Sequence, residues 1–535
     1  MYYNLKKQNI NLIKKLTYDL VSINSITNTK GEVEASLYIY NFLSSLDYFK
    51  HNRQNLILQE LGDNLQRKNV IAILKANNLK NNNVVVLLSH FDTVDIEDYQ
   101  NLKKYAFDID KLTSKIKELY LSNKLDNNPD IKEIVDDIES NRYLFGRGLL
   151  DMKAGVAVNL AIIKELAENI DKFNGIVIAL FVADEETNSL GMLKAVEFLY
   201  DYKKNTKVNY VACIDTDYVV KTKENNNIIV NSYYGSIGKI LVGFYVKGIE
   251  THVGESYKGL NPLLILSKII GSLEMNKNIV NKKNEQVIPP TFIYGKDLKE
   301  SYSVKTPSDA FAFLNVLIFD NNIEKIITNI VRILKNVLKP FINKHQLQVF
   351  NYQEFNNLLK IKLKENYDVI YDNLKQKLYN EYKLGKIDER FYALYLIKEL
   401  NNYLDFNPRV VVFLAPPFYP AVFNKNKKII KILEDVLKSF DGEYKHNLKQ
   451  FFPYISDLSF LAKINNIDYI KDNLVGFNEI YFLDFEKINY ISMDVFDIGT
   501  LGNDAHKFTE RLDSFYTFNI LPNVVFSFIN KIFEN

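Results

Sequence analysis

The sequence predicts an α/β protein whose mostly parallel, helix-flanked sheet is interrupted by an inserted α+β domain, itself enlarged by a helical block. Three observations support this prediction. Four apolar, strand-like runs alternate with helix-spaced segments in residues 1–232, which favours a parallel sheet. Alternating strands and long charged helical patterns follow in residues 233–415, with the helical block at about 322–404. The α/β pattern resumes in residues 416–535, so we expect the first and last segments to form one discontinuous domain.

The predicted strands of this discontinuous domain are short apolar runs rich in β-branched residues. Helical spacing precedes them at Lys6–Val21 and Gly31–Leu46. We expect the first two strands to be neighbours across a short polar turn, and residues 96–141 to form a charged excursion on the surface. The four runs are NVIAIL (69–74), VVVLLS (84–89), GIVIALFVADEE (175–186) and VNYVACIDTD (208–217).

The inserted domain is predicted from a change of pattern. KILVGFYVKG (239–248) and FAFLNVLIFD (311–320) are expected strands on either side of a helical NPLLILSKIIGSL (261–273). Long helical patterns follow, and RVVVFLAPPFYP (409–420) is a strand broken by prolines, which is typical of a return linker.

Composition excludes several classes of function. The 535 residues carry a net charge of 67 − 65 = +2, so no basic surface predicts a nucleic-acid or membrane partner. The single cysteine, Cys213, excludes an internal disulfide and suits a reducing cytoplasm. No segment has the about 18 apolar residues of a membrane span, and the N-terminus lacks a signal-peptide core. We therefore expect a cytoplasmic protein.

Histidines and carboxylates gather where the predicted strands end. Ligands in open α/β sheets bind at the carboxyl ends of strands, so these side chains are candidates for one site. Imidazole and carboxylate without thiolate suit Zn²⁺, with Mn²⁺ or Co²⁺ as possible substitutes. Two histidines and several carboxylates exceed one tetrahedral zinc and match two zincs that share a bridging carboxylate. The residues are His90, Asp92, Asp151, Glu185, Glu186, Asp215 and His506.

Taken alone, each of these residues also has an ordinary structural interpretation. His90 and Asp92 could form a hydrogen-bonded pair at a strand end, or a metal ligand with its orienting carboxylate. The adjacent Glu185 and Glu186 point to opposite sides of a strand, so one could bind metal while the other removes a proton from water.

Five motifs together resemble the co-catalytic zinc aminoacylase/carboxypeptidase superfamily, which includes carboxypeptidase G, peptidase T, acetylornithine deacetylase and succinyl-diaminopimelate desuccinylase. Details of PRVVVFLAPPFYP, FFPYISDLSFL and GTLGNDAHKFTER are most similar to its arginine-utilisation RocB branch. The five motifs, which span residues 84–510 in the order of the family, are SHFDTVD, GRGLLDMKAG, ADEETNSLG, CIDTD and GNDAHKFTE.

The resemblance implies a role for each residue at a matching position. His90 would ligate the first zinc, with Asp92 bound to its other ring nitrogen, and Asp151 would bridge both metals. Glu185 would be the general base and then the acid for the leaving amine. Asp215 would complete the first site, with Asp217 as its substitute because residues two apart share a face. Glu186 and His506 would hold the second zinc.

In the inserted domain, KGIETHVGESYKGLNP resembles the lid segment of the superfamily. The resemblance implies that His252 stabilises the oxyanion, often reaching across from a partner subunit. The lid suggests a possible homodimer, although some relatives with an enlarged lid act as monomers. The lid arginine of many relatives is missing from SDAFAFLNVLIFDNN, so Arg409 is a candidate for the substrate carboxylate, although it could equally be structural. The helical block could cover the site, form a dimer interface or enlarge the domain.

We therefore expect a metal-dependent amide hydrolase that acts on N-acyl amino acids or short peptides, with a possible link to arginine or ornithine metabolism. Two alternatives stay open. An N-carbamoyl amide hydrolase would use the same metal site with different lid contacts. A catalytically silent metal-bound binding or regulatory protein would keep the scaffold without the reaction.

Overall fold

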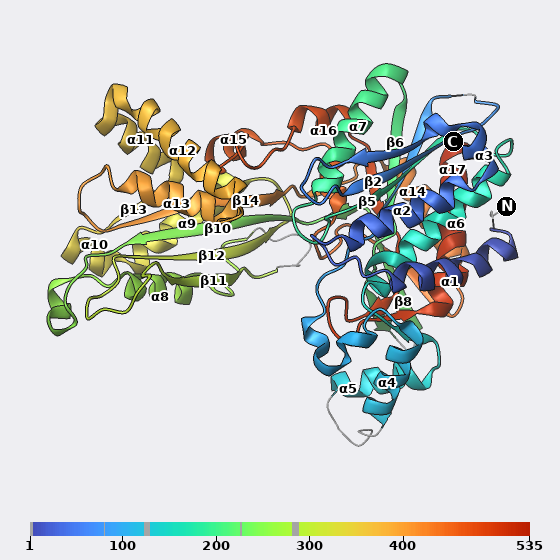
Figure 1. The fold of residues 1–535 in the computed structure, drawn as a ribbon, viewed down its shortest axis with the longest axis horizontal. Helices are drawn as coiled ribbons and strands as arrows, with labels where there is room; N and C mark the ends of the chain where they lie inside the picture. The colour runs from blue at the N-terminus through green and yellow to red at the C-terminus, as the bar shows by residue number, and fades with distance from the viewer. Residues whose placement is uncertain (1–3, 80, 122–128, 225–226, 281–287, 535) are drawn as a thin grey trace. The chain divides into compact units, whose positions relative to one another are not determined.

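The computed structural model divides the chain into two compact units (Figure 1). The first unit comprises residues 1–236, 423–463 and 486–535, and the second comprises residues 237–422 and 464–485. The structure describes residues 4–79, 81–121, 129–224, 227–280 and 288–534.

A mixed sheet forms the centre of the first unit. In the described residues it has nine strands in the order β1-β2-β5-β3-β6-β17-β8-β16, with β7 paired to β8. Strands β5, β3, β6 and β17 are mutually parallel. Three of the four predicted apolar runs are among them, whereas the fourth, β2, is antiparallel to β5. The strands are β1 (Leu56–Glu60), β2 (Lys68–Lys75), β3 (Asn83–His90), β5 (Ile176–Val182), β6 (Asn209–Asp215), β7 (Lys221–Glu224), β8 (Asn227–Tyr233), β16 (Tyr444–Lys449) and β17 (Asp494–Asp497).

The expected pairing of the first two apolar runs is wrong. Strand β5 lies between β2 and β3, antiparallel to the first and parallel to the second. Every residue of β5 is buried, so the strand needs a hydrogen-bonding partner along both edges. This order brings the ends of β5, β3 and β6 side by side, at the edge where the candidate residues lie.

Helices cover both faces of this sheet and supply most of its apolar core. Helix α6 is almost wholly buried and packs against α1 and α17, whose apolar side chains belong to the same cluster. The chain begins α6 directly after the loop that carries Asp151. The main helices are α1 (Lys7–Ser22), α2 (Gly31–Ser44), α6 (Ala154–Glu168), α7 (Leu190–Thr206), α14 (Lys427–Ser439) and α17 (Leu521–Glu534).

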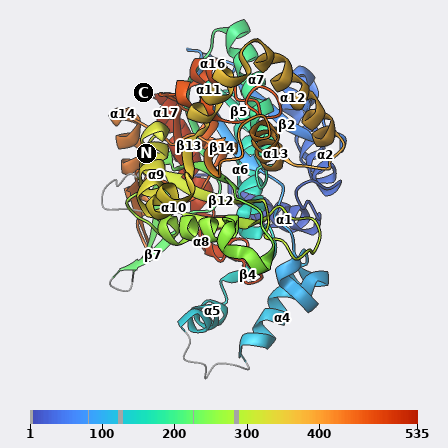
Figure 2. The same ribbon diagram turned by 90° about the vertical axis from the view of Figure 1, so that its left-hand side faces the viewer.

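The charged excursion is a small helical subdomain of the first unit. It contains the 3-10 segment Glu97–Tyr105, α4 (Ile109–Leu121) and α5 (Pro129–Glu139), and it packs on its own apolar cluster. Figures 1 and 2 show α4 and α5 projecting together from the rest of that unit. It adjoins a three-stranded sheet of β18 (Gly502–Asn503), β19 (Arg511–Asp513) and β4 (Tyr143–Phe145).

The second unit is built on a five-stranded sheet in the order β11-β12-β10-β14-β13. The predicted helical block is not continuous, because β13 within it pairs in parallel with β14. The elements are β10 (Gly238–Lys247), α8 (Pro262–Leu273), β11 (Thr291–Asp297), β12 (Asp309–Ile318), α9 (Ile323–Val337), α10 (Lys339–His345), β13 (Gln348–Asn351), α11 (Tyr352–Leu363), α12 (Tyr367–Lys383), α13 (Glu389–Asn401) and β14 (Arg409–Tyr419).

The helical block contributes helices to both faces of this sheet. Strand β12 presents Phe311 and Phe313 to one side, where they join a cluster with side chains of α11 and α13. Helices α8 and α9 pack on the other side, and Figure 2 shows the two helical layers with the strands between them. Because β14 is buried along its whole length, the sheet is stable only with apolar cover on both faces. The block is therefore part of the core of the second unit.

The unit boundaries differ slightly from the predicted domain boundaries. Residues 464–485, predicted to belong to the sheet domain, are part of the second unit. There, the Val475 N–H donates to the Leu414 carbonyl of β14, and the Phe418 N–H donates to the Tyr481 hydroxyl.

Candidate metal centre

Three neighbouring strand ends of the first unit place the candidate residues. His90 is the last residue of β3, and Leu88 of that strand pairs with Asp215, the last residue of β6. Glu185 and Glu186 lie in the turn that follows β5, on the other side of β3. The strands are buried, so their ends are fixed by the sheet itself.

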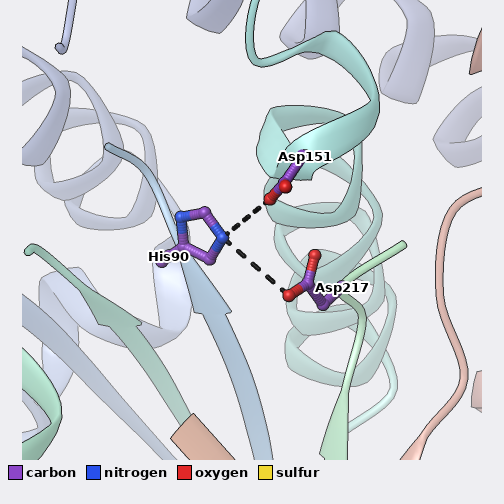
Figure 3. A group of neighbouring side chains, drawn as sticks. All are labelled: His90, Asp151 and Asp217. Carbon is purple, nitrogen blue, oxygen red and sulfur yellow. Dashed lines mark hydrogen bonds and ion pairs between the residues drawn. The ribbon is translucent and has the colours of Figure 1, made fainter. Parts of the chain in front are cut away.

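Two groups of His, Asp and Glu in the described ranges place their ligand atoms within 4.8 Å of one another. The first comprises His90, Asp151 and Asp217, all buried. His90 Nε2 lies 3.0 Å from Asp151 Oδ1 and 4.0 Å from Asp217 Oδ2. Figure 3 shows the imidazole pointing toward both carboxylates.

The second group shares Asp151 with the first. His506 Nε2 lies 3.0 Å from Asp151 Oδ2 and 3.1 Å from Glu186 Oε2. The His506 side chain is 48% exposed, so this group opens to solvent. The two oxygens of one carboxylate therefore face two different histidines, which is the arrangement expected of a bridging ligand.

The pKa shifts and the hydrogen bonding of the carboxylates in these two groups are those expected of residues that bind cations. Burial raises the pKa of Glu186, and the neighbouring Asp151 raises it further, although the hydrogen bond to His506 lowers it. The buried Glu186 Oε1 has no hydrogen-bond partner. Burial also raises the pKa of Asp217 well above its ordinary value, as does Asp151. Burial makes the charged forms of these carboxylates costly, and a divalent cation would offset that cost, so these residues fit one.

Both histidines are held in their charged forms by these carboxylates. Burial lowers the pKa of His506, but hydrogen bonds to Asp151 and Glu186 more than offset it and raise the pKa to about 12. Burial likewise opposes the charge of His90, yet its hydrogen bonds to Asp151 and Asp92 raise that pKa well above its usual value. A cation at either group would take the place of these protons.

Glu185 lies beside the first group without belonging to it. Its Oε2 is 3.9 Å from His90 Nε2. Burial raises the pKa of Glu185 well above its ordinary value; His90 lowers it, while Asp457, Glu186 and Asp217 raise it again. A carboxylate with a raised pKa is a stronger base near neutral pH.

Asp92 contacts more of the site than the His90 ring. Its two carboxylate oxygens accept the backbone N–H groups of Glu185 and Glu186, both at 3.1 Å. His90 Nδ1 lies 3.2 Å from the Asp92 main-chain oxygen and 3.5 Å from Oδ1. Asp92 therefore orients the Glu185–Glu186 turn as well as the His90 ring.

Asp217, the substitute named from the sequence, lies in the first group, and Asp215 does not. Asp215 Oδ2 accepts a hydrogen bond from the Ser456 hydroxyl at 2.9 Å. Burial raises the pKa of Asp215 to about 6. The chain leaves β6 after Asp215, so the alternation of a strand no longer applies two residues later. The structure therefore brings Asp217, and not Asp215, together with His90 and Asp151.

Sequence reasoning missed the residues that fix the turn after β5. Asp184 has φ = 68°, and its N–H donates to Glu32 Oε1 at 3.0 Å. Arg67 donates to both Glu32 and Asp184, at 3.0 and 2.7 Å, and all three side chains are buried. Glu32 and Arg67 lie far from Asp184 in the chain and outside any motif, so they carry no local signal. Gly191 was also missed, although a Cβ there would lie 2.2 Å from the Ala183 oxygen.

The second unit holds the other two predicted residues. His252 is exposed, and its Nδ1 accepts the N–H of Gly254 at 3.1 Å, so Nε2 carries the proton. Arg409 is fully buried. Its Nε donates to Gln348, and its Nη1 donates to Asn401 and to the Asp405 carbonyl, at 2.9–3.0 Å. It also pairs with the Asp405 carboxylate, so the structural alternative fits Arg409 and substrate binding does not.

A model of the peptidase family M20/M25/M40 matches residues 86–479. The chain belongs to this family. It is therefore a hydrolase of the metallopeptidase and aminoacylase type, and the predicted family and enzyme class are confirmed. Within the described residues, no helix is long and apolar enough to cross a membrane.

Two proteins of Bacillus subtilis are similar to this M20 chain along almost its whole length. The uncharacterized protein YqjN is 33% identical over 530 residues, which cover 95% of this chain and 94% of YqjN. The protein RocB is 30% identical over 540 residues, which cover 96% and 93% of the two chains. The predicted similarity to the RocB branch is confirmed.

Solved structures confirm the α/β fold. A tripeptidase from Staphylococcus aureus has a TM-score of 0.55 at 13% identity and covers 100% of both chains. The YXEP protein of Bacillus subtilis, a dinuclear metal-binding peptidase of the M20 family, has a TM-score of 0.53 at 10% identity, with 99% of both chains covered.

Proposed function

We propose that this M20 chain is a two-cation amide hydrolase that acts on N-acyl amino acids or short peptides. The observation that carries the proposal is the shared carboxylate of Asp151, between His90 on one side and His506 on the other, with Glu185 beside them. The imidazole and carboxylate groups suit cation binding, and the additional carboxylate of Glu185 suits proton transfer.

The proposed ligands are His90, Asp151 and Asp217 for one cation, and Asp151, Glu186 and His506 for the other. Zn²⁺ suits imidazole and carboxylate donors, and Mn²⁺ or Co²⁺ could replace it. When bound, such cations supply Lewis acidity toward the amide carbonyl and lower the pKa of water. The buried Glu186 Oε1 supports the proposal, because a carboxylate oxygen that accepts no hydrogen bond is available to coordinate a cation.

Glu185 is the proposed proton carrier. Its carboxylate removes a proton from the attacking water and later gives it to the leaving amine. The raised pKa of Glu185 supports both steps, since a stronger base accepts the first proton and holds it for the second. Asp92 fixes the main chain of Glu185, which keeps the carboxylate beside the two groups.

His252 is proposed to stabilise the oxyanion of the tetrahedral intermediate. The hydrogen bond from Gly254 to Nδ1 leaves an N–H donor at Nε2, which is the chemistry an oxyanion needs. We also propose a homodimer through the second unit. Its edge strand β11 pairs only with β12 in the described residues, and Ile293 and Tyr294 on it are 57% and 45% exposed. Sedimentation of the wild type tests the dimer, and a monomer contradicts it.

The test is amine release from N-acyl amino acids, N-carbamoyl amino acids and dipeptides, with arginine and ornithine derivatives included because RocB is a relative. Zinc-reloaded wild type and Glu185→Gln are compared. We expect zinc-dependent turnover that falls by about 10²–10⁴-fold in the variant, with unchanged metal content. Activity on carbamoyl compounds alone would favour the carbamoylase alternative. Turnover that Glu185→Gln retains would contradict the proposal.

A further inference from the structure

Two buried arginines connect the charged excursion to the loops that carry Asp151 and His506. Arg147 and Arg511 are each 1% exposed, and each pairs with a carboxylate of the excursion. Buried arginine is costly unless its donors are satisfied, so these contacts hold the guanidinium groups in defined positions. The contacts of Arg147 end at a proposed cation ligand, and the contacts of Arg511 end in the loop that carries another.

The first chain of contacts runs from Asp98 to Asp151. The 3-10 segment of the excursion supplies Asp98, which accepts from Arg147 Nη2 at 2.9 Å. Arg147 Nη1 donates to Glu510 Oε2 at 2.7 Å. The other oxygen of Glu510 accepts the N–H groups of Leu150 and Asp151, at 3.0 and 3.4 Å. Glu510 therefore fixes the main chain of the bridging aspartate.

The second chain of contacts runs from Asp137 to the loop of His506. Asp137 on α5 accepts from Arg511 Nε at 2.8 Å, and Arg511 also pairs with Asp504. Asp504 has φ = 61° and His506 has φ = 66°, so the loop has two left-handed residues within three positions. Strand pairing on the N-terminal side of this loop is limited to the two residues of β18. Backbone hydrogen bonds from Lys507 to Asp504 and from Glu510 to Lys507 lie within the loop, and the side-chain contacts of Asp504 add to them.

We infer that the excursion is a positioning element for the two cation groups, acting through Arg147 and Glu510 on the shared Asp151 and through Arg511 and Asp504 on the loop of His506 in the second group. The inference rests on the proposed function and adds to it. Contacts behind the ligands of a metal commonly change its affinity by about 10–100-fold when they are lost. Arg511 acts on one group only, whereas Arg147 reaches the aspartate that both groups share.

If these arginines had only a structural role, their substitution would lower the melting temperature without changing the affinity for cations. Arg409 in the second unit provides the matched control, because it is as buried as the other two and its donors are satisfied by one carboxylate and two side-chain amides. Lysine keeps the charge of arginine but loses its planar fork of donors. Arg511→Lys, Arg147→Lys and Arg409→Lys should therefore all lower the melting temperature, whatever the role of the residue.

The experiment measures the two dissociation constants for Zn²⁺ by chelator competition in the full chain, with melting temperature in parallel. We expect Arg511→Lys to weaken one cation by about 10–100-fold and the other by less than about 3-fold. Arg147→Lys should weaken both, and Arg409→Lys neither. Asp137→Asn keeps the shape of the side chain and should weaken the same cation as Arg511→Lys, which covers the case in which that variant fails to fold.

The outcomes separate the inference from the proposed function. If the wild type binds two cations and both Arg511→Lys and Asp137→Asn leave the two dissociation constants unchanged, the inference is wrong and the proposed function stands. If the wild type binds fewer than two cations, both are overturned. Because the readout is affinity, a wild type that binds two cations but hydrolyses nothing in the substrate panel still tests the inference.

Discussion

The two candidate cation groups share Asp151 but are built in different ways. In the first, His90 and Asp217 lie at or just beyond the ends of buried parallel strands, and the sheet fixes them. In the second, His506 lies on a loop, has a positive φ and is about half exposed. The comparison shows how one site can combine a rigid half with an adjustable half whose position depends on side-chain contacts.

Asp151→Asn is expected to have the largest effect, because it removes the charge that both groups share. We expect the variant to lose both cations. Its rate of hydrolysis should fall by at least as much as that of Glu185→Gln, which we expect to fall by about 10²–10⁴-fold. Metal analysis after gel filtration checks this, with Glu185→Gln as the matched control that keeps its metal. Retention of one tightly bound cation by Asp151→Asn would mean that the two groups do not share this carboxylate.

A chelator should separate the groups by their exposure. His506 of the second group is 48% exposed, whereas the first group is buried, so we expect EDTA to remove a cation from the second group faster than from the first, by on the order of tenfold. Stopped-flow release from Co²⁺-loaded protein, followed by absorbance, measures both phases. A single phase with an amplitude of two cations would remove the distinction between the groups.

Asp215→Asn is expected to have the smallest effect, on stability alone. Burial raises the Asp215 pKa to about 6, so the folded protein loses stability as pH rises from about 3.8 to 6 and that carboxyl ionises. The variant removes this loss, and we expect metal-free Asp215→Asn to be more stable than wild type by about 1–3 kcal/mol at pH 7, with little difference at pH 4. Urea unfolding at both values checks it; loss of a cation in the variant would restore Asp215 as a ligand.

Much of the site could be predicted because its residues follow recognisable strands. The apolar runs before His90 and Glu185 predict buried strands, and carboxyl ends of such strands are where ligands bind. The choice between Asp215 and Asp217 could not be made, because it depends on how the chain leaves β6 and on Ser456, which is far away in the sequence.

The contacts of the turn after β5 and the order of the strands could not be predicted from local sequence patterns. Arg67 and Glu32 reach the turn after β5 from two distant segments, and neither belongs to a motif. The place of β5 between β2 and β3 depends on edge pairing, which a short polar turn does not reveal. By contrast, the role of the helical block has a signal in the sequence: β12 is apolar on both faces, so Phe311 and Phe313 need a second helical layer.

The most direct test of the account is the zinc content of the full chain at equilibrium, measured by mass spectrometry of the metal for wild type, Asp217→Asn and His506→Ala. The account predicts two zincs in the wild type and one in each variant, since each substitution removes a ligand of one group only. A single zinc in the wild type, or two in either variant, would contradict the central claim that two cations share Asp151.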